Sequence, residues 1–239
     1  MGSEMCIRDR LSAVLSQKKN LKDTPVFVES LSTLEGNIAP LLELNKVCKK
    51  HGAKLIVDES LAVGVLGILG SGGVEMAGLS GKEIVSITGF QHALGFLGAA
   101  ISGPKLEMKK VLTADRTYLE QPLMPVPQLH GLEEAIGLIE LEVRKRSKLR
   151  TNCLQLRDGL RSMGYKFAGD PVSPIINISL GRAPLNEKLV KGLFERKIIV
   201  ASSSDNSARI MVSSEHKSKH IGELLQAAED VGKRIKAIS

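Results

Sequence analysis

Apolar and polar positions in the first half of the chain alternate between strand-like and helix-like stretches. PVFVES at 25–30, AKLIVDE at 53–59 and EIVSI at 83–87 are short runs rich in β-branched or apolar residues, and LGAAIS at 97–102 continues the series. Between the first two runs, PLLELNKVCKKHG at 40–52 starts with a proline, has apolar residues at helical spacing, and ends in lysines and a glycine. This strand–helix–strand spacing predicts a mostly parallel sheet covered by helices.

The pattern changes in the second half of the chain. The proline-rich stretch QPLMPVPQ at 121–128 interrupts the alternation and predicts a linker. After it come a long amphipathic helical pattern at 129–163, YKFAG at 165–169, PIINISLG at 174–181, a helix at 186–197, IIVAS at 198–202, ARIMVSS at 208–214 and a final helix from about residue 217. These segments predict a small sheet backed by helices. We therefore expect a first domain at 11–120 and a C-terminal α+β domain at 129–239.

The first ten residues need separate treatment. MGSEMCIRDR at 1–10 has no hydrophobic periodicity, and its SEMCIRDR part resembles a translated sequencing-library adapter. We expect this segment to lie outside the fold, as an expression tag would. On this interpretation the first domain begins part-way through and is incomplete.

Composition narrows the class of protein. A chain of 239 residues with 43% hydrophobic content can build a core, and no run approaches eighteen consecutive apolar residues, so no membrane span is predicted. Cys6, Cys48 and Cys153 are far apart and form no CxxC pair. Their spacing argues against a disulfide framework or a cysteine zinc site and favours a reducing compartment. The formal charge of +7 would suit nucleic acid, but aromatic residues make up only 3% and Trp is absent, so base stacking has little support.

Two stretches place candidate functional residues at the ends of predicted strands. VDESLAVGVLGILGSGG at 57–73 has an acid where a buried strand ends, followed by five glycines. This arrangement is typical of a charge and a flexible loop over a pocket, although a plain strand-end acid and a turn give the same pattern. SITGFQHALG at 86–95 places His92 between a strand and a glycine-bearing turn. There it could be an acid/base group, a ligand or a residue that replaces a catalytic one.

The stretch at 57–73 resembles the VDDSHAVGxLGxxGxG segment of the α-oxoamine synthases, which are aspartate-aminotransferase-like (fold type I) enzymes that use pyridoxal phosphate. VFVESLSTLEGNIAPLLEL at 26–44 resembles that family's strand, turn and helix. VSPIINISLG at 172–181 and ARIMVSSEHKSKHIGELL at 208–225 resemble its C-terminal strands and last helix. The resemblance runs from about residue 10 to the end and covers about the C-terminal half of a member. It implies an α/β fold, with a partial large domain of mostly parallel sheet and a smaller α+β C-terminal domain.

The resemblance assigns roles to single residues. Asp58 matches the aspartate that pairs with the pyridine nitrogen of the cofactor and keeps it protonated. Leu61 stands where active members have a histidine near the cofactor, and it cannot hydrogen-bond. QHALG at 91–95 matches the GKALG segment that holds the Schiff-base lysine, so His92 stands at the lysine position. Asp58 and His92 are therefore expected to be vestigial cofactor contacts, and no catalytic residue is assigned.

The loss of the lysine has a direct chemical consequence. An imidazole cannot form the covalent link that a lysine amine forms with pyridoxal phosphate. Lys105 and Lys109 lie beyond the strand that follows His92, so neither is expected to replace the missing amine. We therefore expect the chain to keep the fold without its own chemistry and not to bind the cofactor covalently.

One branch of the family has this character, the non-catalytic first long-chain-base subunit of serine palmitoyltransferase. DESLAVGVLG at 58–67 resembles that subunit's DES-x-x-FGVLG segment, and HALG at 92–95 resembles its HALA or NALA segment. Two departures are present. Ser71 replaces the usual arginine of a GRG turn, and TYLEQPLMPVP at 117–127 replaces an FSASxPP stretch.

The resemblance implies a regulatory subunit that pairs with a lysine-bearing catalytic subunit in a heterodimer. The complex would condense L-serine with a fatty acyl-CoA to give 3-ketosphinganine, using pyridoxal phosphate on the partner, at the cytosolic face of the endoplasmic reticulum membrane. The alternative is an independently active α-oxoamine synthase with altered cofactor binding. A co-expressed lysine-bearing paralogue would favour the first hypothesis.

Other candidate residues carry weaker signals. Arg209 lies in a predicted strand of the C-terminal domain where fold type I enzymes often hold a substrate carboxylate, so it is a candidate substrate-binding residue. His216 and His220 are four residues apart, as in half a zinc site, but no glutamate follows the first histidine and no third ligand is evident. We interpret them as a solvated helix face and predict no metal site. Cys48 and Cys153 fall on helical patterns and are interpreted as core or surface thiols.

Overall fold

The computed structural model describes residues 4–17, 24–114, 120, 124–202 and 207–238. The chain divides into two compact units. Met1–Leu31 and Ala39–Val143 form the first, called the N-terminal unit, and Ser32–Ile38 and Arg144–Ser239 form the second, called the C-terminal unit. Each unit has its own sheet and its own core.

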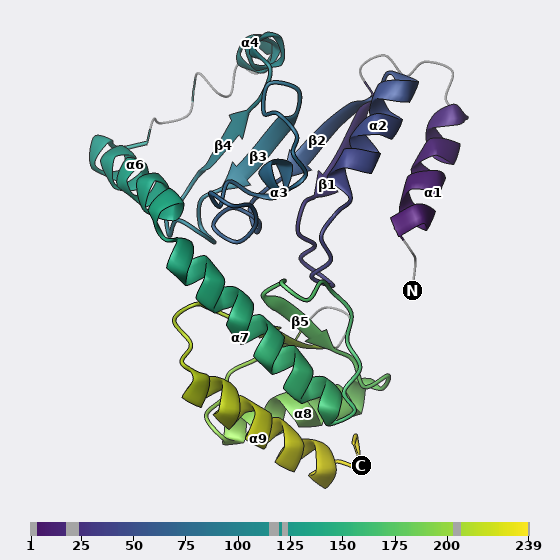
Figure 1. The fold of residues 1–239 in the computed structure, drawn as a ribbon, viewed down its shortest axis with the longest axis vertical. Helices are drawn as coiled ribbons and strands as arrows, with labels where there is room; N and C mark the ends of the chain where they lie inside the picture. The colour runs from purple at the N-terminus through teal and green to yellow at the C-terminus, as the bar shows by residue number, and fades with distance from the viewer. Residues whose placement is uncertain (1–3, 18–23, 115–119, 121–123, 203–206, 239) are drawn as a thin grey trace. The chain divides into compact units, whose positions relative to one another are not determined.

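The sheet of the N-terminal unit has the strand order β1-β2-β3-β4 (Figure 1). The strands are β1 (Pro25–Glu29), β2 (Lys54–Asp58), β3 (Val85–Gly89) and β4 (Ala99–Ser102). The first three are parallel, with Glu29 opposite Asp58 and Asp58 opposite Ile87, while β4 runs antiparallel to β3. The predicted mostly parallel sheet is confirmed, and the carboxyl ends of its parallel strands meet at one edge.

Helix α2 (Leu41–His51) forms as its sequence predicts. Pro40 precedes its first turn, and Gly52 ends it with a left-handed φ of 70°, its N–H donating to the carbonyls of Cys48 and Lys49. The apolar face of α2 packs on the sheet, and the resulting core contains Leu41, Leu44, Val47, Cys48, Leu55, Val57 and Ile84. This packing holds the central strand β2 rigid beneath the residues that follow it.

The segment 1–10 was expected to lie outside the fold, but its residues 4–10 belong to helix α1 (Glu4–Ser16). The contacts of α1 with the core come from Leu11 and Leu15, which follow that segment. A helix anchored by its second half extends backwards one residue at a time without further packing, because propagation costs less than nucleation.

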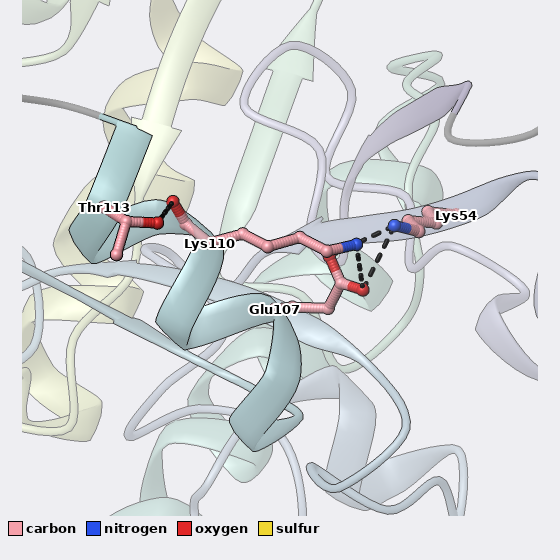
Figure 2. A network of polar contacts seen from close by, with 4 residues as sticks. All are labelled: Lys54, Glu107, Lys110 and Thr113. Carbon is pink, nitrogen blue, oxygen red and sulfur yellow. Dashed lines mark hydrogen bonds and ion pairs between the residues drawn. The ribbon is translucent and has the colours of Figure 1, made fainter.

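Helix α4 (Lys105–Ala114) follows β4 and is tied to the beginning of β2 (Figure 2). Lys54 Nζ lies 3.1 Å from Glu107 Oε1, and Lys110 Nζ lies 3.3 Å from the same oxygen. The hydrogen bond from Lys54 holds the pKa of Glu107 below its usual value. Since Lys54 is the first residue of β2 and Asp58 is the last, this network anchors α4 toward the amino edge of the sheet, away from Asp58.

The boundary between the units differs from the predicted linker at 121–128. Residues 121–123 lie outside the described residues, and helix α6 (Val126–Leu141) begins within the proline-rich stretch. Pro127 lies in the first turn of α6, where a missing N–H breaks no helical hydrogen bond, so this proline starts a helix. The long helical pattern at 129–163 is interrupted at Glu142, and the units divide between Val143 and Arg144.

The C-terminal unit has a small antiparallel sheet of order β5-β7-β6. Its elements are α7 (Val143–Ser162), β5 (Ile175–Ile178), α8 (Ala183–Glu195), β6 (Ala201–Ser202), β7 (Ala208–Met211) and α9 (Ser218–Arg234). The predicted small sheet backed by helices is therefore confirmed. The YKFAG stretch contributes only an isolated bridge, between Phe167 and Ile178.

The two faces of this small sheet differ, as the two-residue period of a strand requires. One face packs on the helices in a core that includes Leu156, Leu160, Ile176, Ile178, Leu189, Leu193, Ala208, Ile210, Ile221 and Val231. The alternate positions, Asn177 on β5 and Arg209 on β7, belong to the other face and lie directly opposite each other.

None of the described helices is both long and apolar enough to cross a bilayer.

Stability of the C-terminal unit is expected to fall at alkaline pH. Burial raises the pKa of Tyr165, whose hydroxyl donates to the carbonyl of Ala228, to about 12, and burial raises that of Cys153 to about 11. Both groups are more acidic in the unfolded chain, so their contribution is complete below about pH 9 and is lost as the pH rises through 11 and 12. Urea unfolding between pH 8 and 11 should show a loss of about 3–4 kcal/mol. The loss should be smaller in Tyr165→Phe, and an unchanged loss in that variant would contradict this origin.

Candidate functional site

Asp58 is the last residue of β2 and lies at the carboxyl edge of the N-terminal sheet. Its Oδ1 accepts a hydrogen bond from the N–H of Ser60 at 2.8 Å, and its main-chain carbonyl accepts from the N–H and hydroxyl of Ser30 at 2.9 and 3.0 Å. The side chain is partly exposed, and Oδ2 has no hydrogen-bond partner among the described residues. The carboxylate is thus held in place with one oxygen open to a ligand.

The glycine-rich loop after Asp58 closes on a second acid, Glu59, which is only 2% exposed. The carboxylate of Glu59 accepts hydrogen bonds from the hydroxyl of Ser30 at 2.6 Å and from the N–H groups of Gly73 and Val74 at 2.8 and 2.7 Å. Gly72 has a φ of 115°, and a Cβ at this position would overlap the Glu59 carboxylate. Glu59 therefore joins the start of the loop to its end.

A third acid, Glu75, orders the middle of the loop. Its carboxylate accepts hydrogen bonds from the N–H groups of Leu69 and Ser71, both at 2.8 Å. Burial alone would raise the pKa of Glu75, but these bonds and one from Ile68 lower it more, so the pKa lies below its usual value. Ser71, the position of the family's arginine, is exposed in this loop. The glycines allow the loop to fold around two carboxylates, which accounts for their spacing without a phosphate.

Sequence reasoning identified Asp58 but missed Glu59. The available signal was the pair of adjacent acids at the end of a buried strand. Successive residues of a strand face opposite sides, so only one of two such acids can point toward a ligand, and the other needs donors inside the protein.

His92 lies in the turn 91–94 that follows β3, and its side chain is exposed. The turn is closed by hydrogen bonds from the N–H of Leu94 to the carbonyl of Phe90, and from the N–H of Phe90 to the carbonyl of Gly98, both at 3.0 Å. The glycine-rich loop touches this turn, because a Cβ placed on Gly64 would lie 3.3 Å from the Cβ of Ala93. The structure thus places the loop of Asp58 and the turn of His92 at one edge.

Leu61 and Ser60 belong to the same edge. Leu61 is partly buried, and its hydrocarbon side chain cannot donate a hydrogen bond to a ligand. The hydroxyl of Ser60 accepts from the N–H of Gly89 at 2.8 Å and so fixes the end of β2 to the end of β3. Leu61, where the resemblance predicts the loss of a hydrogen-bond donor, therefore lies in an ordered part of this edge.

Lys105 and Lys109 do not belong to this edge. Both are exposed on α4. In the antiparallel pair, Gly89 at the end of β3 lies opposite Ala99, whereas Ser102 at the end of β4 lies opposite Ser86. The chain therefore travels away from His92 before α4 begins. Both lysines thus follow the end of β4 that lies away from the turn of His92.

The described residues fit pyridoxal phosphate only in part. The open carboxylate oxygen of Asp58 suits a protonated pyridine nitrogen. At the other end of the cofactor, His92 has no primary amine to bond the aldehyde, and Leu61 has no donor for the phenolic oxygen. The edge can contact the pyridine nitrogen but cannot hold the aldehyde covalently through His92.

Arg209 lies on β7 of the C-terminal unit, and its structure is described within that unit alone. Its register partner on β5 is Asn177. The Nε of Arg209 and the Oδ1 of Asn177 are both buried, and neither has a hydrogen-bond partner among the described residues. A buried donor or acceptor without a partner costs about 1–3 kcal/mol, so this pair is suited to a ligand that bears both an acceptor and a donor. Sequence reasoning missed Asn177, whose signal is a polar residue between isoleucines in a strand.

His220 lies in the first turn of α9 and His216 lies two residues before that helix, with ring centroids 6.3 Å apart. The Nδ1 of His216 accepts from the N–H of Ser213 at 3.1 Å, and the Nδ1 of His220 accepts from the N–H of Lys217 at 3.3 Å. Both rings thus bind main-chain groups near the start of the helix. Within the described parts of the chain, no group of three or more histidine, cysteine, aspartate or glutamate side chains is arranged to hold a metal.

The two cysteines that the sequence places on helices are both buried. Burial raises the pKa of each thiol, in the case of Cys153 to about 11, so the nucleophilic thiolate is disfavoured. Cys48 and Cys153 are core residues, one in each unit.

Comparisons with known proteins agree with this geometry. The family model described as aminotransferase class I and II matches residues 6–227. The 8-amino-7-oxononanoate synthase of Thioalkalivibrio sulfidiphilus is 30% identical over 224 residues, which cover 87% of this chain and 57% of that protein.

Solved structures show the same similarity. A serine palmitoyltransferase of Sphingomonas wittichii has a TM-score of 0.90 at 25% identity, over 97% of this chain and 60% of that one. A serine palmitoyltransferase from S. paucimobilis, solved with a pyridoxal phosphate–myriocin aldimine, has a TM-score of 0.87 at 25% identity, over 95% of this chain and 58% of that one. The chain therefore spans less than two thirds of the length of each of these proteins.

The matches agree in fold and in cofactor. The fold is the α/β fold of fold type I enzymes, with one mixed, mostly parallel sheet and one small antiparallel sheet, and the family uses pyridoxal phosphate. The chain belongs to the aminotransferase class I and II family, in its α-oxoamine synthase branch.

Proposed function

We propose that this chain is the non-catalytic subunit of an α-oxoamine synthase complex of the serine palmitoyltransferase type. The observation that supports it is the position of His92, in an exposed turn after β3 at the sheet edge that carries Asp58. Lys105 and Lys109 belong to α4, which is anchored toward the other edge. An imidazole in the place of the lysine leaves the chain dependent on a partner for the covalent step.

In this proposal the partner is a lysine-bearing subunit of the same family, and the two form a heterodimer. The partner's lysine holds pyridoxal phosphate, and the complex condenses L-serine with a fatty acyl-CoA to give 3-ketosphinganine and carbon dioxide. The chain contributes a rigid edge, in which Glu59 and Glu75 order the loop next to the His92 turn. In this proposal the complex lies at the cytosolic face of the endoplasmic reticulum membrane.

A second candidate is an independently active α-oxoamine synthase that binds its cofactor without a covalent link. The feature that favours it is Asp58, which keeps an open carboxylate oxygen at the expected contact for the pyridine nitrogen. A chain that has no use for the cofactor has no chemical reason to keep this contact.

A reduction experiment tests the first proposal. The purified chain is incubated with pyridoxal phosphate, treated with sodium borohydride and digested, and its peptides are weighed by mass spectrometry. We expect no cofactor mass on any peptide at stoichiometric level, because no lysine replaces His92 at this edge. The serine palmitoyltransferase that was solved with pyridoxal phosphate as an internal aldimine is the positive control and should carry one cofactor per chain. One stoichiometric adduct on this chain would overturn the proposal.

Substitution at the lysine position sharpens this test. His92→Lys alone is expected to give no condensation of L-serine with acyl-CoA, because Leu61 removes a second cofactor contact. The matched control is His130→Lys, which places the same amine on an exposed part of α6. Condensation by His92→Lys but not by His130→Lys, without any partner, would show that the missing lysine is the only lesion and that Leu61 is not a second one.

A further inference from the structure

The C-terminal unit contains a cavity of about 340 Å³ that none of the roles above uses. Its apolar lining includes Ile198, Val200, Ile210, Val212, Ile221 and Leu224. Its polar lining residues are Lys197, His216, His220 and Glu223. Cavities that bind small ligands have volumes of about 300–1,000 Å³ and combine apolar walls with a few polar groups. This cavity lies at the small end of that range and has a mixed apolar and polar lining.

The cavity exists because two neighbouring segments bind different partners. The ladder between β6 and β7 includes the pair of Ala201 with Arg209, but the preceding residues 197–200 belong to no strand. The N–H of Ile198 donates to the carbonyl of Leu193 at 3.0 Å, while the N–H of Val212 donates to the carbonyl of Pro174 at 2.9 Å. The ladder therefore ends at Ala201, and residues from both segments line the cavity.

The backbone at one end of this gap is strained. Lys197 has a φ of 61°, in the left-handed region that costs a residue with a Cβ about 1 kcal/mol. A glycine would remove this strain, yet the chain has a lysine here. The strain is an observation independent of the cavity itself, and it falls on the residue that brings a cation to the cavity.

The polar groups of the cavity favour an anion. Because the Nδ1 atoms of His216 and His220 accept main-chain N–H groups, each neutral ring carries its proton on Nε2 and is a hydrogen-bond donor. Lys197 adds an ammonium group. The one acidic lining residue, Glu223, lies 3.8 Å from Lys219 and so has a cation of its own.

We propose that this cavity binds a linear amphiphile with an anionic head group, in chemical class a fatty carboxylate. The apolar walls take the hydrocarbon chain, and Lys197 with the two histidines binds the carboxylate. The inference rests on the C-terminal unit alone and does not depend on the function proposed for the edge that carries His92.

Calorimetry on the whole chain with three probes of equal chain length tests the proposal. The probes are decanoate, 1-decanol and decyltrimethylammonium, each kept below its micelle concentration. Decanoate is expected to bind about tenfold more tightly than 1-decanol, because a charged head group gains hydrogen bonds that a neutral one cannot match. Decyltrimethylammonium is expected to bind more weakly than either. Equal binding of the three probes, or no binding of decanoate, would overturn the proposal.

Two variants locate the site, each with a matched control. Lys197→Gly removes the ammonium and the strain, so it should weaken decanoate about tenfold, leave 1-decanol unchanged and preserve or raise the melting temperature. Its control is Lys236→Gly, which relieves a similar left-handed φ of 57° away from the cavity and should leave binding unchanged. If Lys197→Gly and Lys236→Gly bind decanoate equally well, Lys197 does not recognise the head group and the proposal fails.

The second variant changes a wall of the cavity that is already in contact with solvent. Ile199 lines the cavity and is 83% exposed, so Ile199→Glu should not disturb folding and should repel decanoate. Phe194→Glu places the same charge on another exposed apolar residue, outside the cavity, and should have no effect. Decanoate binding that survives Ile199→Glu would place the site elsewhere and overturn the proposal.

Discussion

Replacing Arg157 by alanine is expected to lower the free energy of unfolding of the C-terminal unit by about 4 kcal/mol. Arg157 is 0% exposed, and its guanidinium donates to the carbonyls of Ala168, Gly169, Ser173 and Ile175 at 3.2, 3.5, 3.2 and 2.8 Å. It also lies over the ring of Phe167, 5.5 Å from its centroid. Alanine would leave buried carbonyls without donors and open a cavity in the core. Hydrogen exchange across residues 153–178 measures the loss locally.

The chain offers a close control on the same helix. Arg161 lies one turn later on α7 and over the same ring, at 5.3 Å, but its side chain is 51% exposed. Arg161→Ala should cost less than about 1 kcal/mol, because it removes an exposed contact and leaves no buried carbonyl unpaired. A loss of the same size in both variants would show that stacking on Phe167, and not hydrogen bonding, gives Arg157 its effect.

Replacing Glu59 by alanine is expected to destabilise the N-terminal unit by about 3 kcal/mol. The change removes the acceptor of three hydrogen bonds and leaves the N–H groups of Gly73 and Val74 buried without partners, while the hydroxyl of Ser30 keeps only the carbonyl of Asp58 at 3.0 Å. The glycine-rich loop should then exchange its amide protons much faster than in the original chain. Urea unfolding followed by circular dichroism gives the free energy, and hydrogen exchange at 66–76 gives the local effect.

Surface and isosteric variants separate burial from charge in this experiment. Glu83→Ala removes an exposed glutamate that pairs with Lys49 at 2.9 Å, and should change stability by less than about 0.5 kcal/mol. Glu59→Gln keeps one acceptor oxygen and should lie between the two. If Glu59→Ala is no more costly than Glu83→Ala, the loop does not depend on this carboxylate.

The sequence predicted most of the N-terminal sheet because its strands are short apolar runs with acids or glycines at their ends. Asp58 and His92 could be placed near each other for the same reason, since both follow parallel strands. The antiparallel direction of β4 was not predicted, because the apolar pattern of LGAAIS does not indicate in which direction the strand runs. The hydrogen-bond donors that surround Glu59 could not be predicted either. They come from Ser30 and from residues 73–74, and the sequence pattern does not indicate that these segments meet at Glu59.

The second half of the chain shows where pattern analysis fails. The proline-rich stretch at 121–128 predicts a linker by composition, yet a proline in the first turn is compatible with the helix that begins at Val126. IIVAS at 198–202 has a strong strand pattern, but only Ala201–Ser202 pairs with β7. Hydrogen bonds to Leu193 and Pro174 decide this outcome, and they depend on tertiary structure that a local pattern does not contain.

The turn at 32–38 has a consequence for how this chain can be divided or inherited. It belongs to the C-terminal unit, although the residues on both sides of it belong to the N-terminal unit. Asp170 holds it there, because its Oδ2 accepts the N–H of Ile38 at 2.7 Å and its own N–H donates to the carbonyl of Gly36 at 3.1 Å. A single recombination point near residue 143 would combine the turn of one parent with the Asp170 region of the other. An exchange of the C-terminal unit between relatives therefore keeps these contacts intact only if residues 32–38 come from the same parent.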